Sequence, residues 1–190
     1  MTVLIIGLIL FLGMHSVSIV APTWRDAIHE RLGDAKWKGI YTLVSIVGFV
    51  LMIVGFGMTR QNPVVLYAPP TWTRHLAMLL LVPVFPLLIA SKLPGRIKSA
   101  TKHPMLLATK IWAFAHLLAA GRAGDVVLFG AILAWAVADR ISFKRRVERA
   151  IPTAPPSPYN DATAVIGGLG LYVLFVMWGH RWLIGISPLG

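Results

Sequence analysis

The chain alternates long apolar runs with short polar connections. Each run is close to the roughly 20 residues that a helix needs to cross a hydrocarbon core of ~30 Å. The pattern predicts an all-α fold: an integral membrane bundle of about six transmembrane helices, in one domain over residues 1–190. The expected helices cover residues of about 3–21, 39–58, 74–91, 104–120, 125–141 and 162–183.

Prolines mark where these helices begin and bend. Pro83 and Pro86 fall inside the third run, where a membrane helix tolerates proline but is expected to kink. Pro104 suits the first turn of the fourth helix, because its missing N–H would have no partner there. The polar residues 24–38 can hold a short amphipathic helix, and the proline-rich end of residues 142–161 predicts an irregular loop.

Glycines in the second and sixth runs allow two helix backbones to approach closely. Ala164 and Gly168 have the spacing of a small-residue packing motif. The glycines expected at such contacts are Gly48, Gly55, Gly57, Gly167, Gly168 and Gly170.

Composition agrees with a membrane protein, since 57% of the residues are hydrophobic and only 13% are charged. The net charge of +11 would indicate nucleic-acid binding in a soluble protein. Here the basic residues lie between apolar runs, where they act as topology signals, so we expect a lipid bilayer around the chain and no nucleic-acid partner. The absence of cysteine excludes disulfides, iron–sulfur clusters and thiolate-ligated haem.

The distribution of Lys and Arg predicts the orientation in the membrane. Thirteen of these residues fall in the first, third and fifth connections, and four fall on the other side. The positive-inside rule places the thirteen in the cytoplasm, so both termini are expected on the opposite side of the membrane.

Ionisable side chains inside a membrane are costly and therefore mark candidate functional sites. Lys110 lies within the fourth helix, where its long side chain can extend to the interface. His15 in the first helix and His116 in the fourth are deeper. At ~1.5 Å per residue, each lies roughly 18 Å from the face at which its helix enters, so their depths differ by only about 6 Å. The two imidazoles are therefore expected near the middle of the bilayer.

The residues around His15 and His116 allow two interpretations. Neutral imidazole is a good ligand for iron, and the mostly small residues on the His116 face would let a flat macrocycle approach. Alternatively, each histidine only bonds a helix partner and binds nothing. Zinc fits less well, since no cysteine or second inward carboxylate lies at ligand spacing. Asp139, beside Arg140, is expected to form an interfacial ion pair, and no pair of carboxylates is arranged for acid–base catalysis.

A long ordered motif runs through the second half of the chain. It comprises Thr101-Lys102-His103-Pro104-Met105, Trp112-Ala113-Phe114-Ala115-His116-Leu117-Leu118, Gly121, Leu128-Phe129-Gly130 and Arg145-Arg146. The first helix adds Phe11, Gly13, His15 and Ser16. With these residues the chain resembles the NnrU family over nearly its whole length. Members of that family are small bacterial membrane proteins associated with denitrification and nitric-oxide metabolism. Lys102 stands where arginine is expected.

The resemblance implies a cofactor and its ligands. The same family includes plant-type 15-cis-ζ-carotene isomerase, a membrane protein with histidine-ligated haem b whose redox state gates double-bond isomerisation. By motif, the ligands fall on His15 and His116, with His103 as a competing candidate. The resemblance therefore implies haem b, and redox or isomerase chemistry with a membrane redox partner or a hydrophobic polyene. It is closer to the bacterial group than to the plant isomerase, so carotenoid chemistry does not follow from it.

The resemblance also implies a multi-pass protein of the bacterial inner (cytoplasmic) membrane, in which the charge distribution predicts both termini in the periplasm. No residue is assigned a catalytic role, and the sequence alone does not make the chain an enzyme. A redox function linked to nitric oxide, a haem-dependent isomerisation and electron transfer are all compatible with the same haem ligands.

Two other functions compete with haem binding. His103-Pro104 is similar to part of the motif with which membrane methyltransferases of the isoprenylcysteine carboxyl methyltransferase type bind S-adenosylmethionine. Those enzymes use a paired acidic motif after the following helix, where this chain has Arg145-Arg146 and a lone Glu148. The third possibility is a non-enzymatic assembly partner of a nitric-oxide or nitrite reductase, whose small-residue helix faces would dock other helices.

Overall fold

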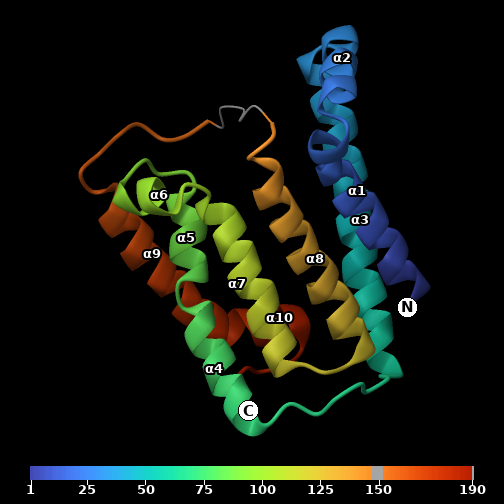
Figure 1. Ribbon diagram of the computed structural model, residues 1–190. Helices are drawn as coiled ribbons and strands as arrows, with labels where there is room; N and C mark the ends of the chain where they lie inside the picture. The colour runs from blue at the N-terminus through green and yellow to red at the C-terminus, as the bar shows by residue number, and fades with distance from the viewer. Residues whose placement is uncertain (147–151, 190) are drawn as a thin grey trace. The chain divides into compact units, whose positions relative to one another are not determined.

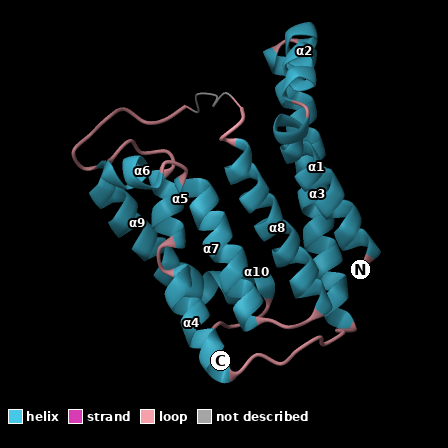
Figure 2. Cartoon of the chain, in the orientation of Figure 1, coloured by secondary structure: helices cyan, strands magenta, loops and turns pink. Residues whose placement is uncertain are grey.

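The computed structural model of the chain describes residues 1–146 and 152–189 (Figure 1). Helices make up the regular structure of these residues (Figure 2), and the described part contains no β-strand beyond an isolated antiparallel bridge between Val65 and Arg122. The predicted all-α class is therefore confirmed. The chain divides into two compact units, Met1–Ala68 with Ala120–Glu148 (unit 1) and Pro69–Ala119 with Arg149–Gly190 (unit 2), and each is described by itself.

Unit 1 is built on a pair of long helices, α1 (Thr2–Val20) and α3 (Asp34–Gln61), which lie side by side (Figure 1). The short helix α2 (Pro22–Leu32) connects them, and α8 (Ala123–Ser142) contacts both. The predicted amphipathic helix in the first connection is thus present as α2. The following helix starts at Asp34 rather than near residue 39, because a carboxylate suits the positive end of a helix dipole.

Glycines bring α1 and α3 into backbone contact. A Cβ atom at Gly7 would lie 2.5 Å from the Met52 nitrogen, and one at Gly48 would lie 2.6 Å from the Phe11 nitrogen. These distances are too short for any side chain, so glycine at these positions sets the separation of the two helices. Gly57 was expected in the same role, but that prediction is wrong, because no atom of another element lies near its Cβ position.

Unit 2 contains the remaining helices, and its buried cluster is formed by Val84, Leu87 and Ala108. Gly168 fits against the backbone of Pro86, which confirms the predicted close packing there, whereas Gly170 faces open space. The elements are α4 (Thr71–Leu81), α5 (Val84–Ala90), α6 (Arg96–Thr101), α7 (Pro104–Ala119), α9 (Asn160–Leu174), the π-helical turn η1 (Phe175–Gly179) and α10 (His180–Ile184).

In unit 2, prolines interrupt and begin helices at the predicted positions. The third apolar run is split into α4 and α5 immediately at Pro83, and α7 begins at Pro104. The proline-rich residues 152–158 are irregular. Residues 147–151 of the same predicted loop lie outside the described residues.

Four segments of the described chain are long and apolar enough to cross a membrane: Thr2–Val20, Asp34–Gln61, Thr71–Ala90 and Asn160–Ile184. The count of six transmembrane helices is not confirmed. Helix α7 has 16 residues and would span only about 24 Å at ~1.5 Å per residue. Helix α8 has 20 residues but carries Asp125, Asp139 and Arg140. The apolar helices fit a multi-pass integral membrane protein.

Candidate functional site

His15 lies on α1 in unit 1, where a hydrogen bond to the backbone orients its ring. Its Nδ1 lies 2.7 Å from the carbonyl oxygen of Phe11, one helical turn earlier. A carbonyl can only accept, so Nδ1–H is the donor and the neutral imidazole carries its lone pair on Nε2. The Phe11 ring lies against the imidazole, with ring centroids 4.3 Å apart.

Two further aromatic rings surround His15, one from each of the other long helices of unit 1. Tyr41 on α3 lies 5.2 Å from the imidazole centroid, and Trp135 on α8 meets it edge-on at 5.9 Å. The Trp135 Nε1 atom is buried and finds no hydrogen-bond acceptor among the described residues. A buried N–H without an acceptor is rare in folded proteins and requires an explanation. A bound group with an acceptor atom would supply one.

His116 on α7 repeats the same local arrangement in unit 2. Its Nδ1 donates to the carbonyl oxygen of Trp112, 2.8 Å away and again one turn earlier. The Trp112 ring stacks at an angle on the imidazole at a centroid distance of 5.0 Å. Ala108 and Ala113 on this helix are fully buried. The hydrogen bond therefore selects the same tautomer for a neutral His116 ring as for a neutral His15 ring.

The two histidines fall in different units, so their predicted pairing at one depth in the membrane stays a prediction. His103, the competing ligand, stands directly before α7 and its carbonyl oxygen accepts the N–H of Leu107 at 3.1 Å. Within the described ranges, no three His, Asp or Glu side chains converge on a possible metal-ion site. A haem iron requires only one or two axial protein ligands.

A hydrogen-bonded turn follows the end of α8 and places Arg146 of the sequence motif against Asp139. The guanidinium also lies over the Phe143 ring at 4.2 Å, and the Ser142 hydroxyl donates to the Asp139 carbonyl oxygen at 2.7 Å. Asp139 does form the predicted ion pair, but its partner is Arg146 rather than the adjacent Arg140. Arg146 of the motif thus has a structural role in unit 1.

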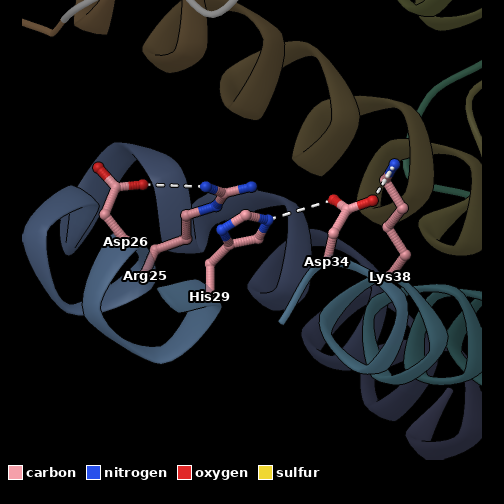
Figure 3. Close-up of polar contacts among 5 residues, drawn as sticks. All are labelled: Arg25, Asp26, His29, Asp34 and Lys38. Carbon is pink, nitrogen blue, oxygen red and sulfur yellow. Dashed lines mark hydrogen bonds and ion pairs between the residues drawn. The ribbon is translucent and has the colours of Figure 1, made fainter. Parts of the chain in front are cut away.

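A second set of ion pairs lies where α2 meets α3 (Figure 3). Asp34 is its centre, since its carboxylate accepts from Lys38 Nζ at 2.6 Å and from His29 Nε2 at 3.2 Å. Arg25 pairs with Asp26 at 2.9 Å and lies over the Trp37 ring. The Asp34, Lys38 and Asp26 side chains are at least half exposed, so this cluster orders a surface corner rather than a buried site.

In unit 2 the carboxylate of Asp161 has a structural role that the sequence did not predict. Asp161 accepts the backbone N–H of Arg96 at 2.8 Å and that of Ile97 at 3.1 Å, which caps α6. The neighbouring Asn160 side chain donates to the carbonyl oxygens of Pro94 and Pro155. Asp161 is 65 positions from Arg96 and Asn160 is 66 positions from Pro94, so no local pattern could have revealed these contacts.

Gly121 of the motif also has a structural explanation. Its carbonyl oxygen accepts the N–H of Leu66 at 2.8 Å, and the Tyr67 hydroxyl donates to the Ala120 carbonyl oxygen at 2.8 Å. A Cβ atom at Gly121 would overlap the Tyr67 carbonyl group. Only glycine therefore allows the loop at Leu66 and Tyr67 to contact the turn before α8.

The motif residues thus divide into two groups, the stacked histidines and the residues that shape helix ends and loops. A comparison with protein families finds a match to the family described as NnrU protein over residues 3–188. No curated protein and no solved structure matches the chain. The family match covers nearly the whole sequence, and the chain therefore belongs to the NnrU family.

Proposed function

We propose that this NnrU-family chain is a multi-pass protein of the bacterial inner membrane that binds haem b through intramembrane histidines. His15 and His116 are the proposed iron ligands, and His103 is the competing candidate. One observation supports the proposal: both rings donate Nδ1–H to the carbonyl oxygen one turn earlier, so Nε2 is the ring nitrogen that would ligate an iron.

This hydrogen bond is the usual support for a metal-binding histidine. Such histidines commonly donate the second ring nitrogen to a carbonyl or carboxylate, which fixes the ring orientation and raises the basicity of the ligand nitrogen. In unit 1 the Trp135 Nε1–H lies beside His15 and has no acceptor among the described residues, and it would meet one on a bound group. Phe11 and Tyr41 offer the apolar surface that a macrocycle requires. The residues present therefore fit a haem.

Haem b would supply one-electron redox chemistry and, with an axial position open, binding of a small molecule such as nitric oxide. The part of this chain is to hold the two imidazoles in one tautomer and to surround them with apolar rings and small residues. We propose that the activity is redox or isomerase chemistry, with nitric oxide or a hydrophobic polyene as the small-molecule partner and a membrane protein as the electron source.

An absorption spectrum of the detergent-purified full chain, oxidised and then reduced with dithionite, tests this proposal. We expect a Soret band and sharp α and β bands on reduction, with about one haem per chain. The protein has to be expressed with ample haem supply, so that a missing band reflects the protein and not the cell. A purified, folded chain without these bands would overturn the proposal.

The same preparation separates the other functions. Binding of S-adenosylmethionine measured by calorimetry, without a haem spectrum, would identify a methyltransferase. Stable co-purification with a nitric-oxide or nitrite reductase, without any cofactor, would identify an assembly partner. Either result would replace haem binding as the assigned function.

A further inference from the structure

The connection between α5 and α7 is strongly basic and carries no acidic residue. It contains Lys92, Arg96, Lys98 and Lys102, and we call residues 92–102 the basic connection. Unit 2 as described has one carboxylate to balance them, Asp161. Charge compensation within this unit is therefore incomplete by composition alone.

The single carboxylate is already engaged by backbone groups. Both oxygens of Asp161 accept N–H groups at the start of α6, so they cap the helix rather than pair with a cationic side chain. Lys98 donates its ammonium group to the carbonyl oxygen of Ser91 at 3.1 Å. The exposed side chains of Lys92, Arg96 and Lys102 make no hydrogen bond or ion pair with the part of the chain that the structure describes.

The backbone that carries these three cations is held in place from both sides. The Lys92 carbonyl oxygen accepts the N–H of Ala154 at 2.9 Å, and the Pro94 carbonyl oxygen accepts from Asn160 at 2.8 Å. On the inner side, Ile97 packs against the buried cluster of unit 2. The cationic side chains therefore extend from a fixed frame, which lowers the entropy lost on binding an anion.

The neighbouring surface is apolar. Leu88 on α5 and Met105 on α7 flank the basic connection in sequence, and they are 38% and 42% exposed on helices that are otherwise apolar. A ligand that satisfies both features needs an anionic head and an apolar body. We propose that the basic connection of unit 2 binds the headgroup of an anionic phospholipid, through Lys92, Arg96 and Lys102.

Lipid titration of the full chain in detergent tests this inference, with phosphatidylglycerol compared with phosphatidylcholine. The readouts are the melting temperature and the number of lipids retained in native mass spectrometry. We expect phosphatidylglycerol alone to raise the melting temperature and to remain bound. The triple variant Lys92→Gln, Arg96→Gln, Lys102→Gln should bind it on the order of a hundredfold more weakly, since each surface cation contributes about fivefold.

A matched variant separates a site from general charge attraction. Arg31→Gln, Lys36→Gln, Lys144→Gln removes the same charge from exposed positions of unit 1 and should retain the phosphatidylglycerol preference. Lys102→Gly provides a second check, because Lys102 has a φ of 60°, a conformation that glycine adopts more easily. It should weaken lipid binding without lowering the melting temperature in phosphatidylcholine.

Three results would overturn the inference. Equal loss of phosphatidylglycerol binding in the unit 2 variant and in its unit 1 control would show attraction by net charge only. Unchanged retention of phosphatidylglycerol in the unit 2 variant would show that these cations do not bind it. Equal stabilisation by inorganic phosphate at matched concentration would identify a soluble anion as the ligand.

Discussion

Units 1 and 2 use their carboxylates differently, although both carry basic residues at helix ends. In unit 1, Asp139 pairs with Arg146 and Asp34 with Lys38, so these two carboxylates neutralise cationic side chains, while Asp125 accepts the backbone N–H of Arg122. In unit 2, Asp161 binds two backbone N–H groups and leaves exposed cations without a described partner. Carboxylates that compensate cationic side chains are thus found in unit 1, whereas the carboxylate of unit 2 shapes a loop.

The histidines show the opposite relation, since their surroundings are alike. Each donates to a carbonyl oxygen one turn earlier and lies against the aromatic ring of that same residue, Phe11 in unit 1 and Trp112 in unit 2. The chain thus varies its charge pairing between the units and keeps one local arrangement around the proposed ligands. Charge pairing therefore differs between the two units, and the arrangement around the histidines is the feature that they share.

The largest effect is expected at the glycine contact of unit 1. Gly48→Val would place a side chain against the Phe11 backbone, where neither helix can yield without separating from the other. We expect a loss on the order of 3 kcal/mol in stability. Tryptophan fluorescence during thermal unfolding measures it. Gly57→Val on the same helix faces open space and serves as the control. Equal melting temperatures for the two variants would show that α1 and α3 are not in backbone contact.

The next largest effect is expected at the ion pair of Asp139. Asp139→Asn would leave the largely buried Arg146 guanidinium without its counter-charge, at a cost of about 2 kcal/mol. Combining it with Arg146→Gln should restore part of the loss, and a double-mutant cycle followed by thermal unfolding measures the coupling. Additive effects of the two substitutions would contradict the pairing.

The carboxylate of unit 2 should matter less for stability. Asp161→Ala removes one side chain that caps α6, and we expect a loss of about 1 kcal/mol together with faster hydrogen exchange at the amides of Arg96 and Ile97. Asp161→Asn keeps one acceptor oxygen, so its stability should lie between that of Asp161→Ala and that of the native protein. Unchanged exchange at both amides in Asp161→Ala would show that the carboxylate does not cap the helix.

The smallest effect is expected at the exposed corner in Figure 3. Asp34→Asn breaks the contacts to Lys38 and His29, but exposed ion pairs contribute little and are screened by salt. We expect the melting temperature to stay close to that of the native protein, and any difference to vanish in high salt. A drop as large as that of Asp139→Asn would mean that Asp34 and Asp139 contribute equally to stability.

Local signals in the sequence predicted much of this fold. Apolar run length gave the all-helical class, and the ring geometry of proline accounts for the break at Pro83 and for the start of α7 at Pro104. The four candidate spans have both sufficient length and low charge. The other two expected spans fail one criterion each, because α7 is short and α8 carries charges near both ends.

Contacts between distant residues were beyond such signals. Asp139 was expected to pair near Arg140, but adjacent residues on a helix point in different directions, and the turn after Ser142 brings Arg146 back instead. Tyr41 and Trp135 reach His15 from two other helices, and their spacing along the chain gives no indication of it. His15 and His116 themselves were found from their depth in apolar runs, and their role as ligands stays a prediction.

The haem content of histidine variants tests the central proposal most directly. Full-length His15→Ala, His116→Ala and His180→Ala proteins are purified in parallel with the native chain, and haem per chain is measured from the reduced spectrum. His180 bonds the Ile186 carbonyl oxygen near the end of the chain and is the control. We predict about one haem per chain in the native protein and in His180→Ala, and loss of stoichiometric haem in the other two. Full haem retention in both His15→Ala and His116→Ala would contradict the proposed ligands.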